Sequence, residues 1–254
     1  MRFRTLCISA LVVAAVDAQP TASSFVSNAP SAPGPAKVEL SSEMRGDIFM
    51  ARKMYREAVE MYQQMPQTSS VTWNKVGIAF HQLGQLNLAR KNYERSIKLN
   101  ANYSEAINNL GTVAYAEKNY RRAVNHYKKA LLFSPDSASI RSNLGTAFFA
   151  RKKYDMAAVE YQRALELDPN VFENRGSQGT VLQERTVHER AKFHFQLAKV
   201  YAKGGQNERA MQYLRKALEE GYAGRDKIAT DDAFQALRDY PEFQILLKTE
   251  FRAL

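Results

Sequence analysis

The chain has little of the residue types that most often carry chemistry. Among its 254 residues there is one cysteine, Cys7, which excludes an intrachain disulfide and a zinc site built on cysteines. There are four histidines, and the closest two, His188 and His194, fall on different faces of a helix. His188-Glu189 resembles the start of a zinc-protease motif, but Lys192 stands where the second histidine belongs. We therefore expect neither a metal ion nor another cofactor.

Catalytic motifs and long apolar runs are also missing. The sequence contains no glycine-rich phosphate loop, no G-x-S-x-G motif and no paired carboxylates of the kind used in acid–base catalysis. No segment after the first 18 residues approaches the roughly 20 apolar residues that cross a bilayer. We therefore expect a protein that is not an enzyme and has no transmembrane span in its mature form.

The first residues are typical of a secretory signal peptide. Arg2 and Arg4 precede the apolar run 6–16, and the small-x-small pattern V-D-A at 16–18 predicts cleavage after Ala18. We therefore expect an exported protein, periplasmic or secreted. A frayed apolar end on a cytosolic chain is the alternative.

Positive charge is in excess, with 36 Lys and Arg against 26 Asp and Glu and a formal net charge of +10. The basic clusters at 52–53, 121–122, 128–129 and 151–153 are typical of solvated faces. Contact with an anionic lipid or polymer of a cell envelope is the alternative. Because the aromatic residues are expected in the core and not interleaved with these charges, we expect no nucleic-acid partner.

An internal repeat of 34 residues organises the middle of the chain. Gly77, Gly111 and Gly145 follow one another at this interval. Four more columns of matched chemistry keep it: Ala89/Ala123/Ala157, Tyr93/Tyr127/Tyr161, Ser96/Ala130/Ala164 and Ala101/Pro135/Pro169. A fixed period of this length indicates a repeat array.

Each repeat has the pattern of two helices joined by a turn. Val76, Gly77 and Phe80 lie on one helical stripe, and Gly84 interrupts the helix before a second apolar stripe begins. Such a pair leaves an apolar seam that the next pair must cover. We expect Trp73 and the recurring tyrosines in that seam and not in a row that stacks on a ligand.

The repeat pattern W-x2-V-G-x2-F…A-x3-Y resembles the tetratricopeptide repeat family. The units around Leu110 and Leu144 match nearly as well, and weaker copies lie at 46–62 and 197–217. The residues that carry the pattern in its first full copy are Trp73, Val76, Gly77, Phe80, Ala89 and Tyr93. The resemblance implies an all-α, right-handed superhelical solenoid of about five helix-turn-helix units with a C-terminal helical cap.

The expected organisation follows from the repeats and from composition. The Ser/Ala/Pro-rich segment 19–38 has too few apolar side chains to offset chain entropy, so we expect a disordered tether there. The segments are 1–18 signal peptide, 19–38 tether, 39–170 repeats one to four, 171–190 insertion loop, 191–222 repeat five and 223–254 capping helices.

Two of these segments need more detail. The insertion has no helical stripe, includes a short extended piece at 180–182, and is either a solvated loop or a contact surface. In the cap we expect helices at about 230–239 and 241–250, the second starting at Pro241.

The family resemblance also implies a peptide-binding groove on the concave side, lined by the first helix of each repeat. Asn109 and Asn143 lie one repeat apart and resemble the asparagine ladder by which some of these superhelices hold a peptide main chain. A side-chain amide matches a peptide unit because it offers a donor and an acceptor. Alternatively, both residues only satisfy the repeat consensus. The further groove candidates are Asn74, Lys75, Asn108, Thr112, Ser142, Thr146, Lys199 and Lys203, which make the groove polar and partly basic.

The function hypothesis is an exported, non-catalytic scaffold that binds protein or peptide segments in this groove. A structural envelope component held to anionic lipid or polymer by its basic outer face is the alternative, and a regulatory subunit of an enzyme would use the same groove.

Overall fold

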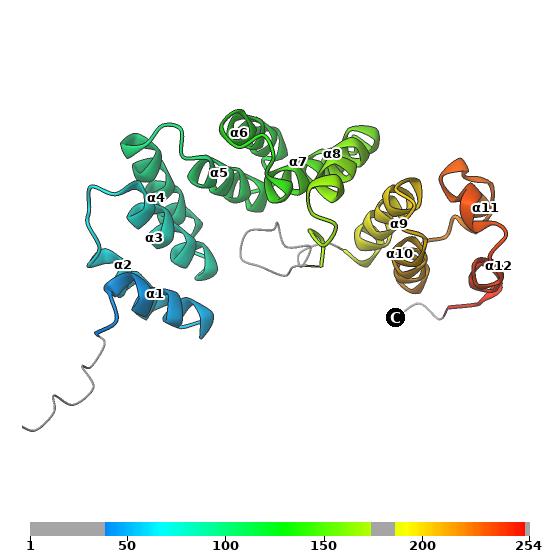
Figure 1. The fold of residues 1–254 in the computed structure, drawn as a ribbon, viewed down its shortest axis with the longest axis horizontal. Coiled ribbons are helices and arrows are strands. Elements are labelled where there is room, and N and C mark those ends of the chain that lie inside the picture. Colours follow the sequence, from blue (N-terminus) through cyan, green and yellow to red (C-terminus); the bar gives the residue numbers. More distant parts are fainter. Residues whose placement is uncertain (1–38, 174–185, 252–254) are drawn as a thin grey trace, which may run out of the picture. The chain divides into compact units, whose positions relative to one another are not determined.

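The computed structural model describes residues 39–173 and 186–251, and every regular element within these ranges is a helix (Figure 1). The elements are α1 (Ser42–Ala51), α2 (Tyr55–Gln63), α3 (Ser70–Gln82), α4 (Leu86–Leu99), α5 (Ser104–Ala116), α6 (Tyr120–Phe133), α7 (Ala138–Ala150), α8 (Tyr154–Leu167), α9 (Val187–Lys203), α10 (Asn207–Glu219), α11 (Arg225–Thr230), the 3-10 helix η2 (Asp232–Leu237) and α12 (Pro241–Lys248). The expected all-α fold is confirmed. None of these helices is long and apolar enough to cross a membrane.

The first ten helices form five consecutive pairs. Each pair packs within itself, as α1 with α2 or α9 with α10, and the second helix of each pair contacts the first helix of the next. The first helices of the second, third and fourth pairs, α3, α5 and α7, also contact one another in turn. This neighbour-to-neighbour packing is the solenoid of helix-turn-helix units that the repeat predicts.

Glycine recurs in the first helix of a pair because a tyrosine ring of the second helix lies directly against it. A Cβ placed on Gly111 would lie 2.5 Å from Tyr127 Cε1, closer than side chains approach. Gly46, Gly77 and Gly145 meet Tyr62, Tyr93 and Tyr161 in the same way. The expected buried seam is confirmed, since these tyrosines and Trp73 are buried.

The fifth pair solves the same packing problem with different residues. Ala198 stands in the glycine column and Leu214 in the tyrosine column, and both are fully buried. The smaller leucine leaves room for the Cβ of the alanine.

The turns inside the pairs use a left-handed backbone residue. It is glycine in two pairs, Gly84 and Gly205, and lysine in the other three: Lys53, Lys118 and Lys152, with φ of 60°, 62° and 59°. Lysine adopts this conformation at a cost that glycine avoids.

The C-terminal cap differs from the expected pair of α-helices. The second expected helix is present as α12, with Pro241 in its first turn, but the helix expected at 230–239 is the shorter 3-10 helix η2, which Asp231 divides from α11, a helix that the sequence did not predict. Asp231 causes the division because its carboxylate accepts a hydrogen bond from the backbone N–H of Ala233 and caps a new helix. Phe234 and Leu237 of η2 are fully buried, and η2 packs on α9.

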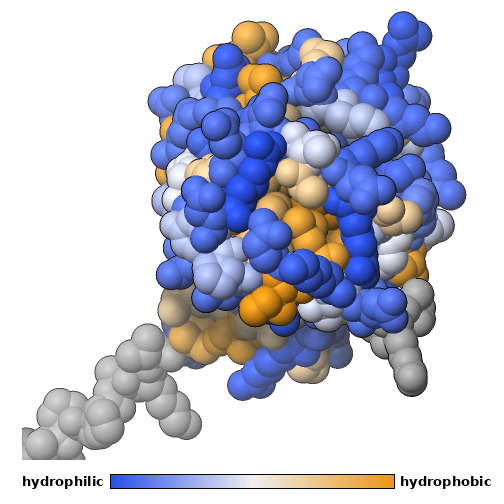
Figure 2. Space-filling model, turned by 90° about the vertical axis from the view of Figure 1, so that its right-hand side faces the viewer, coloured by the Kyte–Doolittle hydropathy of each residue, from blue (hydrophilic) through white to orange (hydrophobic). Residues whose placement is uncertain are grey.

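The outer face of the cap is largely polar. Figure 2 shows mostly hydrophilic side chains at the C-terminal end, with apolar side chains gathered near the middle of that face. Ile245 of α12 is among the apolar residues that stay exposed. A polar outer face is what the end of a solenoid needs, since no further unit covers it.

The insertion ends earlier than expected. Helix α9 begins at Val187, where Thr186 and Glu189 form a reciprocal capping box, so residues 187–190 are helical. The predicted signal peptide, the tether and the extended piece at 180–182 lie outside the described residues.

Candidate functional site

A cavity of about 750 Å³ opens on the side formed by α1, α3, α5 and the start of α7. Its wall is mixed, with slightly more apolar than polar surface, and the apolar part comes from scattered side chains. The lining residues are Asp47, Met50, Tyr62, Val71, Asn74, Lys75, Ile78, Tyr103, Ser104, Glu105, Asn108, Asn109, Ser134, Pro135, Asp136, Ser137, Ser139 and Ile140. We call this cavity the groove pocket.

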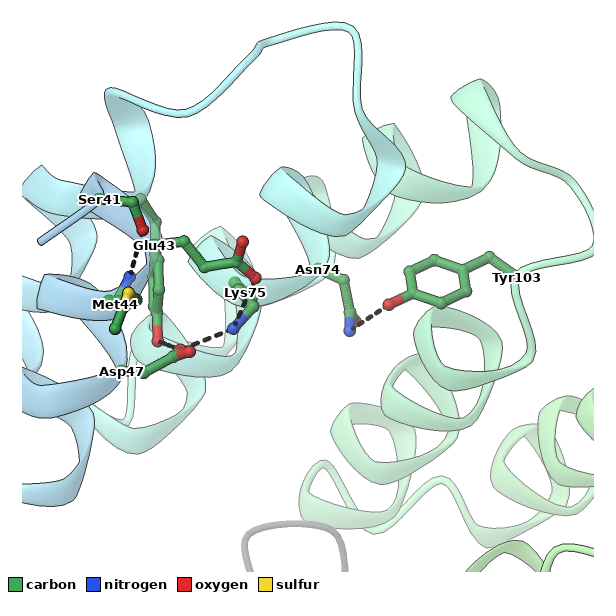
Figure 3. A network of polar contacts seen from close by, with 8 residues as sticks. Ser41, Glu43, Met44, Asp47, Asn74, Lys75 and Tyr103 are labelled. Carbon is green, nitrogen blue, oxygen red and sulfur yellow. Dashed lines mark hydrogen bonds and ion pairs between the residues drawn. The ribbon is translucent and has the colours of Figure 1, made fainter.

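An ion-paired lysine forms one end of the groove pocket (Figure 3). Lys75 of α3 lies between two carboxylates of α1, with its Nζ 2.6 Å from Asp47 Oδ1 and 3.2 Å from Glu43 Oε1. The Tyr62 hydroxyl donates a hydrogen bond to the same Asp47 oxygen over 2.7 Å. The positive charge of Lys75 is therefore already matched by the first helix pair.

The titration behaviour of these groups reflects the pairing. Burial alone would raise the pKa of Asp47, but the hydrogen bonds from Lys75 and Tyr62 outweigh it and hold that pKa below its ordinary value. Burial would lower the pKa of Lys75, and the two carboxylates instead raise it. Burial, with Asp47 beside the phenol, raises the pKa of Tyr62. All three groups keep their ordinary charges at neutral pH.

Asparagine side chains link three consecutive repeats, and three of the four asparagines line the groove pocket. Asn109 Nδ2 donates to Asn74 Oδ1 over 2.9 Å, and Asn108 Nδ2 donates to Asn109 Oδ1 over 3.3 Å. Asn143 Nδ2 donates to Asn108 Oδ1 over 3.0 Å, which brings α7 into the chain. We call Asn74, Asn108, Asn109 and Asn143 the asparagine ladder.

The ladder ends at Tyr103, the residue before α5. Asn74 Nδ2 lies 3.5 Å from the Tyr103 hydroxyl, and Figure 3 shows the two side chains pointing toward each other across the pocket. Burial, together with the negative charge of Glu105, raises the pKa of Tyr103. The phenol therefore stays protonated and keeps a hydrogen to donate.

The structure brings four of the ten predicted groove residues into one cavity: Asn74, Lys75, Asn108 and Asn109. Of the ladder members among them, Asn74 and Asn108 are buried, whereas Asn109 is half-buried. Asn109 therefore presents the most accessible amide to a ligand.

The other six predicted residues do not line the groove pocket. Ser142, Asn143 and Thr146 are buried in α7, and Thr112 and Thr146 contact the hydroxyls of Tyr127 and Tyr161. Lys199 of the fifth pair forms an ion pair with Asp231 of the cap at 2.7 Å, and Lys203 lies exposed at the end of α9.

The groove pocket is acidic, whereas the sequence predicts a polar and partly basic groove whose basic members Lys199 and Lys203 lie outside this cavity. Its wall holds three carboxylates, Asp47, Glu105 and Asp136, and one cation, Lys75. Sequence reasoning missed the carboxylates and Tyr103. Only Asp47 could have been found from the repeat. It directly follows Gly46, and the same position after the glycine holds the groove candidates Thr112 and Thr146 in later repeats. Glu105 and Asp136 occupy different columns, and acidic residues near helix starts are common for electrostatic reasons alone.

Within residues 39–173 and 186–251, no group of three or more histidine, cysteine or acidic side chains is arranged to hold a metal ion. The chemistry available in the groove pocket is hydrogen bonding by amides and hydroxyls, together with carboxylate charge.

Matches to known protein families agree with the observed stack of helix pairs. Residues 138–171 match a family described as Tetratricopeptide repeat, residues 113–150 match one described as TPR repeat, and residues 71–103 and 191–220 match another Tetratricopeptide repeat family. The chain is a tetratricopeptide repeat protein. The first pair, α1 and α2, lies outside these segments although it packs like the others.

Three relatives share part of the chain. They are the chloroplastic tetratricopeptide repeat domain-containing protein PYG7 of Arabidopsis thaliana (26% identity over 99 residues, 36% of this chain and 33% of that protein), the human tetratricopeptide repeat protein 7B (28% over 99 residues, 39% and 11%) and the uncharacterized protein ycf37 of Pyropia yezoensis (32% over 59 residues, 23% and 33%). The matched part is about a third or less of the length of these curated relatives.

Solved structures of MamA are similar in their arrangement of helices. MamA AMB-1 aligns with a TM-score of 0.48 and 22% identity over 71% of this chain and 98% of that one. MamA 41-end from Desulfovibrio magneticus RS-1 aligns with a TM-score of 0.47 and 19% identity over 70% of this chain and 92% of that one.

Proposed function

We propose that this protein is an exported scaffold that binds an extended segment of a partner protein in the groove pocket, without catalysis. The observation that carries the proposal is a cavity of about 750 Å³ that crosses four helix pairs and has the side-chain amides of Asn74, Asn108 and Asn109 in its wall. A tetratricopeptide repeat scaffold is consistent with protein–protein interaction.

The dimensions of the groove pocket suit a short extended peptide. Helices α3, α5 and α7 contact one another in turn, and packed helix axes lie roughly 8–10 Å apart. A strand that crosses from α3 to α7 covers about 20 Å, and at about 3.3–3.6 Å per residue it needs about six residues. Asn109 and the Tyr103 hydroxyl are placed to hydrogen-bond its main chain.

A bulky substitution inside the groove pocket tests the proposal. Val71 lines the pocket and is 36% exposed, so Val71→Trp fills the cavity with little effect on packing. Leu88→Trp is the matched control, because Leu88 is 39% exposed on α4 and lies outside the pocket. The full chain is immobilised and offered a pool of blocked, randomised octapeptides, and the retained peptides are measured by mass spectrometry.

We expect Val71→Trp to lower peptide retention by about fivefold or more and Leu88→Trp to leave it unchanged. Equal retention by both variants and the parent chain would place the binding surface elsewhere, and no retention by the parent chain would reject the groove function.

Attachment to an anionic cell envelope is the second candidate function, and the basic residues in the left-handed turns favour it. Three turns keep a strained lysine, and two of these, Lys53 and Lys152, have a further basic neighbour in the turn. This basic edge suits anionic lipid. Cosedimentation with vesicles that contain or lack anionic lipid tests it, and sedimentation that does not depend on anionic lipid counts against it.

A further inference from the structure

We infer that the groove pocket selects an extended peptide that carries a lysine or arginine side chain, whose cationic group binds Glu105 and Asp136. This inference rests on the proposed function and adds the chemical character of the partner. It follows from the difference in charge between the pocket and the rest of the chain.

The two ends of the groove pocket differ in how their charges are matched. At the α1 end, Lys75 is held by Glu43 and Asp47, so its charge is not available to a ligand. At the other end, no lysine or arginine of the described residues lies within ion-pair distance of Glu105 or Asp136. Glu105 accepts a hydrogen bond from the neighbouring Ser104 hydroxyl over 3.0 Å. The pocket therefore has two carboxylates without a cation in a chain whose formal net charge is +10.

The positive ends of the helix dipoles offset part of this negative charge but not all of it. Glu105 lies in the first turn of α5, and Asp136 precedes Ser137, the N-cap of α7. A helix N-terminus carries only about half of a positive charge, whereas each carboxylate carries a full negative charge. Both residues line the groove pocket and are exposed, so their charge is open to a cationic group that enters the pocket.

The surroundings of the carboxylates fit a long cationic side chain. Pro135 lines the same end of the groove pocket and is exposed, so it offers apolar surface. Lysine and arginine pack their methylene stems on such surface while the charged group stays at its polar edge. A small inorganic cation makes no use of the apolar wall, and a neutral peptide makes no use of the carboxylates.

The octapeptide pool also tests this inference, now by the composition of the retained peptides. The full chain is compared with the double variant Glu105→Gln/Asp136→Asn, which keeps size and hydrogen bonding and removes the charge. The matched control is Glu94→Gln/Asp155→Asn, which removes two exposed carboxylates outside the groove pocket. Blocked peptide ends keep terminal charges from contributing, and circular dichroism melting confirms that each variant is folded.

We expect peptides retained by the parent chain and the control to be enriched in lysine or arginine by about three- to tenfold over the input pool. The groove double variant is expected to lose this enrichment while it still retains peptides, and raising salt from about 50 to about 300 mM is expected to weaken the enrichment in the parent chain. Retained peptides without basic enrichment, or equal enrichment in the double variant, would overturn the inference and leave groove binding intact. Retention that Val71→Trp does not change would instead reject the groove itself.

Discussion

At the residue scale, the glycine and tyrosine columns form one packing unit. The tyrosine ring occupies the space of the missing Cβ, so neither residue can change alone without a clash or a cavity. The fifth pair shows that both can change together, since Ala198 and Leu214 are fully buried there.

Transplanting that pair into the third repeat tests the coupling. Gly111→Ala is expected to destabilise by about 1–3 kcal/mol through overpacking, and Tyr127→Leu by about 2–4 kcal/mol through lost volume. The double variant is expected to be more stable than the sum of the two losses by at least about 1 kcal/mol, because the leucine leaves room for the new Cβ. Thermal unfolding of the four proteins gives the coupling, and strictly additive losses would contradict it.

The left-handed lysines make a second prediction at this scale. Lys152→Gly removes about 1–2 kcal/mol of strain from the left-handed backbone of the folded state. Glycine also raises the conformational entropy of the unfolded chain, which offsets part of this gain. We expect a net increase of about 0.5–1 kcal/mol in the free energy of unfolding. Lys153→Gly removes the same charge at a position with φ of −93° and is the control. A gain of equal size in both variants would assign the effect to charge and not to backbone strain.

At the element scale, the asparagine ladder joins α3, α5 and α7, and three of its members, Asn74, Asn108 and Asn109, line the groove pocket. Its members differ in exposure, and this difference distinguishes a structural role from a binding role. Asn108 is buried and holds Asn143 at 3.0 Å, whereas half-buried Asn109 keeps amide surface toward the cavity. Asn108 therefore has a structural role, whereas Asn109 is the candidate for ligand binding.

Two alanine variants distinguish these roles. Asn108→Ala removes the acceptor for a buried amide and is expected to lower the free energy of unfolding by about 1–3 kcal/mol. Asn109→Ala is expected to cost less stability, about 0.5–1.5 kcal/mol, because the side chains it leaves, Asn74 and Asn108, line the open groove pocket where water can replace the lost partner, and to lower octapeptide retention. Unfolding and retention are measured on both, and a loss of retention in Asn108→Ala alone, in the folded protein, would reverse the assignment.

At the scale of the whole molecule, the charge is unevenly placed. The chain has a formal net charge of +10, yet the groove pocket holds three carboxylates and one paired lysine. A basic peptide and an anionic membrane would both bind less tightly at high salt, so salt alone does not distinguish the two proposals. The octapeptide pool and the vesicles do, because each offers one kind of partner.

The predicted export also belongs to the scale of the whole chain. The sequence predicts cleavage after Ala18, so the C-terminally tagged protein recovered outside the cytoplasm of an export-competent host is expected to begin at Gln19. Ala18→Arg is expected to retain the leader, because a large charged residue does not fit a small-residue cleavage site. Intact mass and amino-terminal sequencing measure both, and a recovered chain that begins at Met1 would contradict the prediction.

Much of the fold follows from sequence because repeat packing is local. Gly111 and Tyr127 are 16 residues apart, and among the described residues the main contacts of each helix pair are with its neighbours, so a period of 34 residues predicts most of the packing. The cap follows less well: its apolar stripe was recognised, but the helix expected at 230–239 is the shorter η2, which begins at the capping carboxylate of Asp231, and α11 before it was not expected.

The sequence by itself determined the repeat, the helix pairs and the residue types along the first helices. Only the tertiary structure decided which of those residues share a cavity, which are buried in α7, and what charge the cavity carries. The reason is that Asp47, Glu105 and Asp136 come from different columns and different repeats, so no period brings them together in the sequence. They line one cavity because consecutive helix pairs stack, and stacking brings together side chains that occupy different positions in their repeats.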